Sequence, residues 1–244
     1  MQNIQQIVPE VPVRDHGAIF RHLLRGYRFR VCDDAASVSL ALDVRRRVYR
    51  GGCGYEIPIP DAYDRRSWFL LAEHTRLGEA VGSMRVTPRF VGPYEAEEYF
   101  TLPRHLRSPT ALEITRFAIV PDHRHSRRFL PVVALGLYKL VCLFTRQLRS
   151  TDVVICAKPE RSWAYQWLAF ERSGLTARYT KLGNAEHELM SCDVRGGMRK
   201  HRDHRYWDFV FEIEHPEVVL PATVPALGLG RQTNVDERQI QRSA

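Results

Sequence analysis

The chain has 244 residues and a formal net charge of +8, with 44% hydrophobic and 26% charged residues. These proportions are typical of globular domains and exclude a largely disordered or fibrous chain. No apolar run is long enough to span a membrane, and the first residues lack the basic start and apolar stretch of a secretory signal, so we expect a cytoplasmic protein. The positive charge predicts an acidic partner, which could be nucleic acid, anionic lipid or an acidic carrier protein.

Proline, glycine and polar residues divide the chain into three parts. We expect an N-terminal arm over residues 1–26, with a short helix at 16–24, one domain over 27–215, and a flexible C-terminal tail over 216–244. The five cysteines are scattered and form no CxxC pair, so we expect free thiols and no metal site.

The first half of the domain combines one helical pattern with three strand patterns. Alternation predicts a strand at 27–32, and Asp33 or Asp34 is placed to cap a helix over 35–49 that ends at Gly51 and Gly52. After these elements we expect a long loop over 51–67, antiparallel strands at 68–73 and 80–88, and an irregular stretch over 89–110 with one helical turn near 95–100.

The second half begins with a strand, a helix and a strand at 111–120, 129–149 and 152–157, which we interpret as a parallel βαβ unit. A second helix at 160–173 and strands near 176–181, 188–194 and 206–213 are expected to follow. This order predicts an α/β fold in which helices flank a mixed sheet.

Charged residues interrupt the most apolar strands. Arg85 lies in GSMRV, and Glu113 and Arg116 lie in LEITRFAI. Burial of an unpaired charge costs roughly several kcal/mol. These residues therefore either pair with one another or line a pocket that contains water.

Polar residues also gather on the first helix and the loop after it. Arg45 and Tyr49 are four apart and share a helix face, which is either a solvated basic face or one wall of a site. Tyr55, Asp61 and Asp64 follow in the loop, where acidic residues commonly form exposed turns.

A basic turn precedes the helix at 129–149. Arg124, Arg127 and Arg128 lie there, at a helix N-terminus that favours anions, so the turn is either a phosphate site or a solvated basic loop. The basic run at 198–205 belongs to no recognisable nucleic-acid-reading module.

Together, the segments RRRVYRGGCGY, PDAYD, GSMRV and LEITRFAI resemble the acyl-homoserine-lactone synthases and the N-acyl amino acid synthases of the GNAT acyltransferase superfamily, over residues 27–194. The resemblance implies a GNAT-like three-layer fold with a mixed, partly splayed central sheet. It also places the functional positions of that family on Arg45, Tyr49, Tyr55, Asp61, Asp64, Arg85, Glu113 and Arg116.

The resemblance implies an N-acyltransferase that moves a fatty acyl group to the α-amine of an amino acid. Glu113 is the expected catalytic base, the other seven positions are expected to bind substrate, and no tightly bound cofactor is expected. Tyr49 and Tyr55 replace the phenylalanine and tryptophan usual in lactone synthases, which favours an amino acid over S-adenosylmethionine as acceptor.

We expect acyl carrier protein to deliver the acyl group on its phosphopantetheine. The turn HRHSRRF lacks the glycines of the loop that binds coenzyme A, and its Arg124, Arg127 and Arg128 are suited to an acidic carrier. The alternatives are a lactone-forming autoinducer synthase that uses S-adenosylmethionine and a basic module that binds nucleic acid or membrane. We expect no nucleic-acid partner, whereas a lipid product would bring the enzyme close to a membrane surface.

Strand geometry adds one further prediction. Glu113 and Arg116 point to opposite faces of a regular strand, so they can serve one site only if a β-bulge separates them. We therefore predict a break in pairing between Glu113 and Phe117, with both charged side chains directed to the acceptor cleft.

Overall fold

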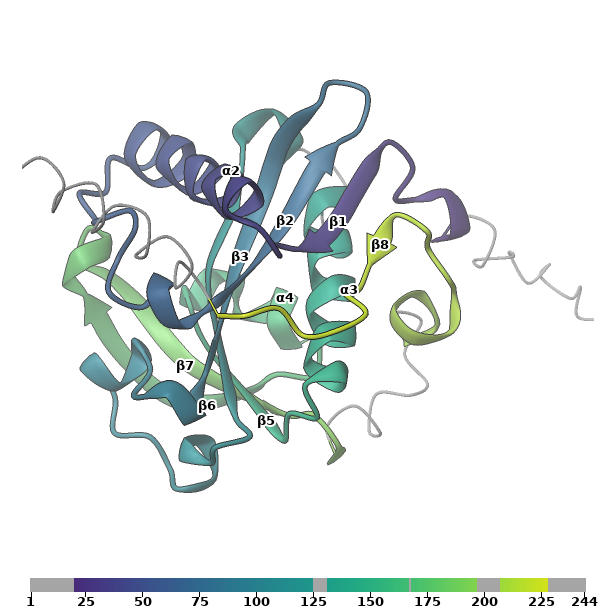
Figure 1. The fold of residues 1–244 in the computed structure, drawn as a ribbon. Coiled ribbons are helices and arrows are strands. Elements are labelled where there is room, and N and C mark those ends of the chain that lie inside the picture. Colours follow the sequence, from purple (N-terminus) through teal and green to yellow (C-terminus); the bar gives the residue numbers. More distant parts are fainter. Residues whose placement is uncertain (1–19, 125–130, 167, 197–206, 228–244) are drawn as a thin grey trace, which may run out of the picture.

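A mixed sheet of eight strands forms the centre of the computed structural model, which describes residues 20–124, 131–166, 168–196 and 207–227 (Figure 1). The strand order is β6-β7-β5-β4-β3-β2-β1-β8. The strands are β1 (Tyr27–Val31), β2 (Trp68–His74), β3 (Glu79–Pro88), β4 (Leu112–Ile119), β5 (Asp152–Ala157), β6 (Glu171–Tyr179), β7 (Ala185–Asp193) and β8 (Val218–Val219). The predicted α/β class and the predicted hairpin of β2 and β3 are confirmed.

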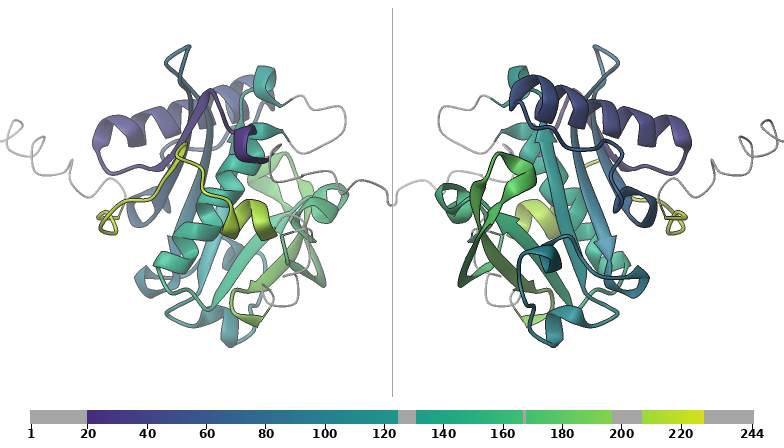
Figure 2. Two further views of the ribbon diagram at one scale, coloured as in Figure 1. Left: turned by 90° about the vertical axis from the view of Figure 1, so that its right-hand side faces the viewer. Right: turned by 90° about the vertical axis from the view of Figure 1, so that its left-hand side faces the viewer.

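Two helices cover opposite faces of the sheet (Figure 2). Helix α2 (Ala35–Arg45) begins at a capping box, in which the Asp34 carboxylate accepts a hydrogen bond from the Ser37 amide. Because side chains alternate along β2, Phe69 packs under α2 and Leu70 packs under α3 (Val132–Gln147). Helix, sheet and helix therefore form the three layers that the sequence predicts.

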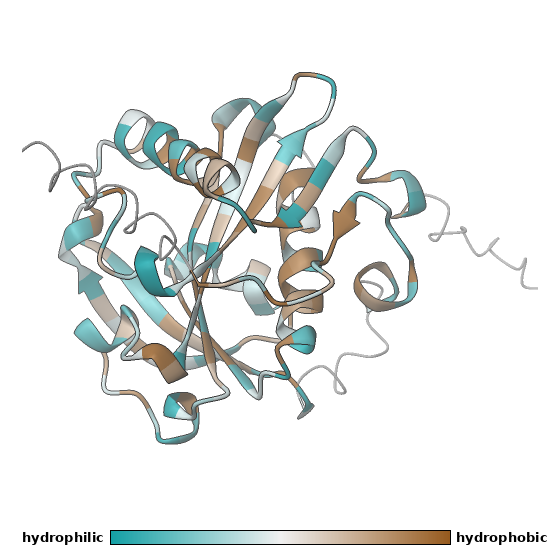
Figure 3. Cartoon of the chain, in the orientation of Figure 1, coloured by the Kyte–Doolittle hydropathy of each residue, from teal (hydrophilic) through white to brown (hydrophobic). Residues whose placement is uncertain are grey.

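Helix α3 packs closely on the sheet at Gly136. It is apolar over most of its surface (Figure 3), and its Gly136 faces the ring of Phe29, which leaves no room for a Cβ atom. The outer side of α3 holds the C-terminal segment, because Lys139 Nζ donates hydrogen bonds to the carbonyl oxygens of Phe209 (2.6 Å), Val210 (3.0 Å) and Ile213 (2.7 Å). A buried ammonium group is thus satisfied by backbone acceptors.

Strands β4 and β5 separate soon after they meet. They are parallel, as the predicted βαβ unit requires, but only Leu112 pairs with Val153 and Glu113 with Val154. Beyond these pairs no strand of the described residues pairs with the edge of β4 that faces β5, so the predicted splayed sheet is confirmed.

A β-bulge interrupts β4 directly after the split. The register with β3 shifts between Ser83 and Arg85, and Arg116 adopts a φ of 56°, in the left-handed region that few non-glycine residues occupy. The predicted break between Glu113 and Phe117 is confirmed. Backbone strain of this kind commonly accompanies a functional site.

Two predicted elements are wrong. The helix expected at 160–173 is reduced to α4 (Ser162–Gln166), because Ala169 enters the left-handed region at φ 68° and residues 171–179 pair with β7 instead. The strand expected at 206–213 is a short π-helix over Asp208–Glu212. Phe209 and Val210 are adjacent in sequence and both are buried, which a strand with one exposed face does not allow.

The chain beyond residue 215 continues along the sheet. Strand β8 pairs with β1 in parallel, and Trp68 Nε1 donates to the carbonyl oxygen of Pro225 at 2.8 Å. The division into arm, domain and tail stays a prediction, since residues 1–19 and 228–244 lie outside the described residues. Within the described ranges, no helix has both the length and the apolar character needed to cross a membrane.

Candidate active site

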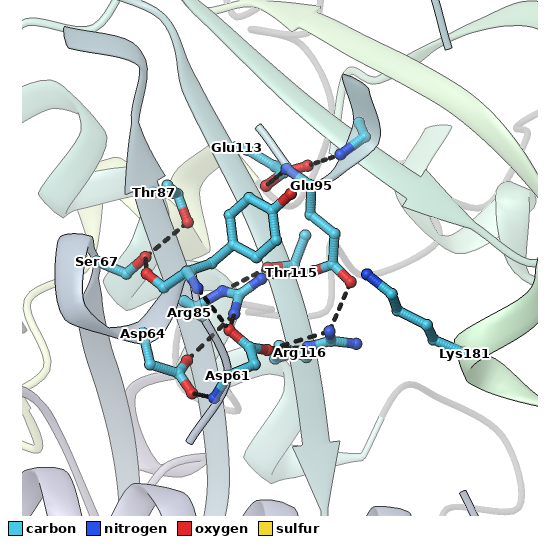
Figure 4. A network of polar contacts seen from close by, with 12 residues as sticks. Asp61, Asp64, Ser67, Arg85, Thr87, Glu95, Glu113, Thr115, Arg116 and Lys181 are labelled. Carbon is cyan, nitrogen blue, oxygen red and sulfur yellow. Dashed lines mark hydrogen bonds and ion pairs between the residues drawn. The ribbon is translucent and has the colours of Figure 1, made fainter. Parts of the chain in front are cut away.

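Three arginines meet in the interior on the α2 side of the sheet. Figure 4 shows two of them, Arg85 and Arg116, among their carboxylate partners. Arg45 comes from the last turn of α2, Arg85 from β3 and Arg116 from the bulge in β4, and all three are buried. Interior guanidinium groups require carboxylate partners, and the loops that follow α2 and β3 supply them.

Asp61 contacts all three guanidinium groups, at 3.1 Å from Arg45, 2.6 Å from Arg85 and 3.1 Å from Arg116. Asp64 lies 2.6 Å from Arg45 and 3.1 Å from Arg85. Burial opposes ionisation of Asp61, but the surrounding arginines outweigh it and hold the pKa of Asp61 below its ordinary value. The five residues predicted in this region therefore form one cluster.

Glu95 completes the cluster and was missed by the sequence analysis. Its two carboxylate oxygens lie 2.5 Å from Arg85 and 2.5 Å from Arg116, so three arginines face three carboxylates. A signal was available in the sequence, because three arginines next to apolar segments were matched with only two loop aspartates. That mismatch predicts a third carboxylate in the irregular stretch between the strands.

Glu113, on β4, lies next to the backbone of Glu95. Its carboxylate accepts hydrogen bonds from the backbone amides of Glu95 (3.1 Å) and Ala96 (2.7 Å), and its side chain is fully buried. Burial, with a smaller contribution from Glu95, raises the pKa of Glu113 to about 7. The cavity described next is lined by Glu95 and Arg116 but not by Glu113, so Arg116 lies at the cavity and Glu113 does not, while the roles expected of both residues stay predictions.

A cavity of about 480 Å³ passes between β4 and β5 and has walls on both sides of the sheet. On the α2 side it is lined by Tyr49, Cys53, Tyr55, Glu95, Thr115, Arg116, Cys156, Lys158, Tyr179, Leu182 and His187. On the α3 side it is lined by Ile114, Phe117, Arg124, Ala134, Tyr138, Val141, Cys142, Thr145, Ile155, Arg161, Tyr165, Leu168 and Phe170. The first wall is polar and aromatic, whereas the second is largely apolar.

Tyr49 and Tyr55 form part of the α2 wall. A π-helix over Arg46–Gly52 continues α2 and carries Tyr49, whose hydroxyl donates to the carbonyl oxygen of Phe117 at 3.1 Å, next to the bulge. The ring of Tyr55 stacks on that of Tyr49 with centroids 6.0 Å apart. Burial raises the pKa of Tyr49 to about 12, so its hydroxyl stays neutral and can donate this hydrogen bond.

The basic turn is described only in part. Arg124 lines the cavity at its α3 side and donates from Nε to the carbonyl oxygen of Ile119 at 2.5 Å. Arg127 and Arg128 lie outside the described residues. Among the residues that are described, no group of three or more His, Cys, Asp or Glu side chains is arranged to hold a metal ion.

Comparison with known proteins identifies relatives of this chain. Residues 43–193 match the family model of the N-acyl amino acid synthase FeeM. A comparison with curated protein sequences gives no significant match.

Several solved structures share the fold. FeeM, an N-acyl amino acid synthase from uncultured soil microbes, superposes with a TM-score of 0.59 at 15% identity and covers 71% of this chain and 93% of its own. BjaI, described as a CoA-dependent acyl-homoserine lactone synthase, gives 0.58 at 19% identity over 86% of this chain and all of its own (100%). The AHL synthase LasI gives 0.54 at 16% identity, over 76% and 94% of the two chains.

Proposed function

Because this chain belongs to the N-acyl amino acid synthase FeeM family and is an acyltransferase, we propose that it transfers a fatty acyl group from acyl carrier protein to the α-amine of an amino acid. The observation that carries the proposal is the cavity between β4 and β5. Its apolar α3 side suits an acyl chain, and its charged α2 side suits a zwitterionic acceptor.

In the proposed reaction the acceptor ammonium approaches from the α2 side and meets Glu95, the carboxylate exposed to the cavity. One proton passes by way of Glu95 to solvent, and the free amine attacks the thioester carbonyl. A carbon–nitrogen bond forms, the carbon–sulfur bond breaks, and the second proton lost by the nitrogen passes to the sulfur, so the carrier leaves as its thiol. Backbone N–H groups of the unpaired part of β4 are the proposed donors to the oxyanion.

This scheme gives Glu113 a positioning role instead of the catalytic one that the sequence predicts. Its hydrogen bonds to the amides of Glu95 and Ala96 fix the start of the turn that presents Glu95. Arg85, Arg45 and the two aspartates likewise hold the loops around the acceptor pocket, while Tyr49 and Tyr55 form its wall.

Acyl carrier protein is the proposed donor because the chain has a net charge of +8 and its basic turn contains no glycine. Docking would place the phosphopantetheine near Arg124, Arg127 and Arg128. Reversing Arg127 and Arg128 to glutamate should raise the KM for acyl carrier protein and weaken its salt dependence, without changing the KM for the acceptor.

Product analysis tests the proposal directly. The enzyme is incubated with acyl carrier protein or coenzyme A carrying the same acyl group, and with an amino acid mixture or S-adenosylmethionine, and products are identified by mass spectrometry. We expect N-acyl amino acids from the carrier protein. Acyl-homoserine lactone as the product would replace the proposal by the lactone synthase alternative, and reaction with coenzyme A alone would overturn the donor.

A further inference from the structure

The acceptor carboxylate needs a cation, and the arginines expected to bind substrate are already paired. Arg116 is bound to Asp61 and Glu95, and Arg85 is bound to three carboxylates. Arg85 does not line the cavity. The Nε and Nη2 groups of Arg116 are engaged by Asp61 and Glu95, whereas each oxygen of Glu95 accepts from one arginine and keeps a second lone pair for the acceptor ammonium. The anionic end of the acceptor must therefore be held elsewhere in the cavity.

Lys158 is a cation on the same wall of the cavity, and no carboxylate of the described residues pairs with it. It follows β5 directly, and alternation along that strand directs it to the α2 side with Cys156. Its Nζ contacts the hydroxyl of Tyr55 at 3.4 Å, and none of the ion pairs between described residues includes it. Tyr55 therefore holds the side chain toward the site while the charge stays available.

The other cations of the cavity are less suitable. Arg124 is engaged by the carbonyl oxygen of Ile119 and lies on the α3 side. Arg161 is exposed and belongs to the turn that enters α4, near Tyr138 and Tyr165 of the α3 wall. Both lie on the side of the sheet assigned to the acyl donor.

We propose that Lys158 binds the α-carboxylate of the acceptor, with Tyr55 positioning its ammonium group and Glu95 receiving the α-amine. This assignment rests on the proposed function. It explains how one wall presents a negative group and a positive group to a zwitterion, and it makes Lys158 a residue that distinguishes α-amino acids from simple amines.

The test compares amino acids with their carboxamides. The probes are L-leucine, L-phenylalanine and their α-carboxamides, chosen because Tyr49, Tyr55 and Leu182 give the acceptor pocket an apolar wall. In the wild-type enzyme we expect each acid to have a lower KM than its amide. In Lys158→Met the KM of the acids should rise roughly 10- to 100-fold, as for loss of one charge-assisted hydrogen bond, and the KM of the amides should stay unchanged.

Two variants separate this role from a structural one. Lys158→Arg should restore much of the preference for acids, and Lys181→Met, which removes an exposed lysine paired with Glu98, should leave it intact. The KM for the acyl donor should not change in any of the three variants. Equal changes for acid and amide in Lys158→Met, or none, would overturn the assignment to Lys158.

The same assay distinguishes failure of the proposed function from failure of the assignment to Lys158. If the wild-type enzyme acylates neither acids nor amides but reacts with S-adenosylmethionine, or with no amine at all, the proposed function is wrong and this inference falls with it. If the wild-type enzyme acylates the acids and their amides with equal KM, the proposed function stands and the role of Lys158 alone is refuted.

Discussion

The two walls of the cavity are held in place by different kinds of interaction. The α2 wall is fixed by buried ion pairs, among them those of Arg85 and Glu95, in which each charged group has several partners. The α3 wall is fixed by rings and aliphatic side chains such as Phe117 and Tyr138, whose rings stack with centroids 5.3 Å apart. Ion pairs demand one geometry, whereas apolar packing tolerates changes of shape, so the first wall suits recognition of a small acceptor and the second suits a chain of variable length.

The largest effect is expected from Arg85→Met. The substitution leaves Asp61, Asp64 and Glu95 buried with one cation fewer, and removal of one partner of such a pair costs about 3–5 kcal/mol of unfolding free energy. Chemical denaturation measures the loss. Arg89→Met is the control, because Arg89 is half-buried and its ion pair within the described part of the chain is with Glu97 alone, so its loss should stay below about 1 kcal/mol. Similar losses in both variants would show that the α2 wall is not held by its ion pairs.

The next effect concerns which carboxylate meets the substrate. Glu95→Gln should lower kcat/KM by roughly 10² to 10⁴-fold, and Glu113→Gln should lower it less, because only Glu95 reaches the cavity. Glu98→Gln, in an exposed position, is the control. Circular dichroism verifies that each variant is folded. The reverse order of the two losses would return the catalytic role to Glu113, as the sequence predicts.

The pH dependence of the free energy of unfolding tests the raised pKa of Glu113. The pKa of Glu113 is raised from 4.5 to about 7, so between these values the folded chain holds a proton that the unfolded chain releases. The free energy of unfolding should therefore fall by up to about 3 kcal/mol as pH rises from 4.5 to 7, relative to Glu113→Gln, which has no carboxyl group to titrate. A constant difference between the two proteins across this range would show that burial does not raise the pKa of Glu113.

The smallest effect is expected on the α3 wall. Cys142→Phe adds bulk to the apolar side of the cavity and should lower the rate with long acyl chains by about tenfold relative to short ones, with little change in the acceptor KM. Cys53→Phe adds the same bulk on the α2 wall and should instead raise the acceptor KM. A steady-state assay over a series of acyl chain lengths distinguishes the two, and identical profiles would mean that the walls do not have separate functions.

Local patterns predicted most of the fold and part of the site. The strands at β1, β2 and β3 and the unit β4-α3-β5 follow from alternation and helical spacing, which neighbouring residues determine. The early end of α4 and the early start of β6 were not predicted, because the left-handed turn at Ala169 and the pairing with β7 are decided by tertiary contacts. Glu95 was missed for the same reason, since its partners come from two strands on either side of it in the chain.

The contact between the two ends of the described chain affects how the protein is made. Strand β8 completes the sheet edge at β1, and His215 Nε2 lies 2.6 Å from the carbonyl oxygen of Phe20, a residue 195 positions earlier. Contacts so distant in sequence form late, because the loop-closure entropy is paid before they contribute. During synthesis, β1 therefore leaves the ribosome long before the segment that covers its edge. A nascent chain that ends before residue 218 would present an open strand edge at β1, which is a known route to aggregation.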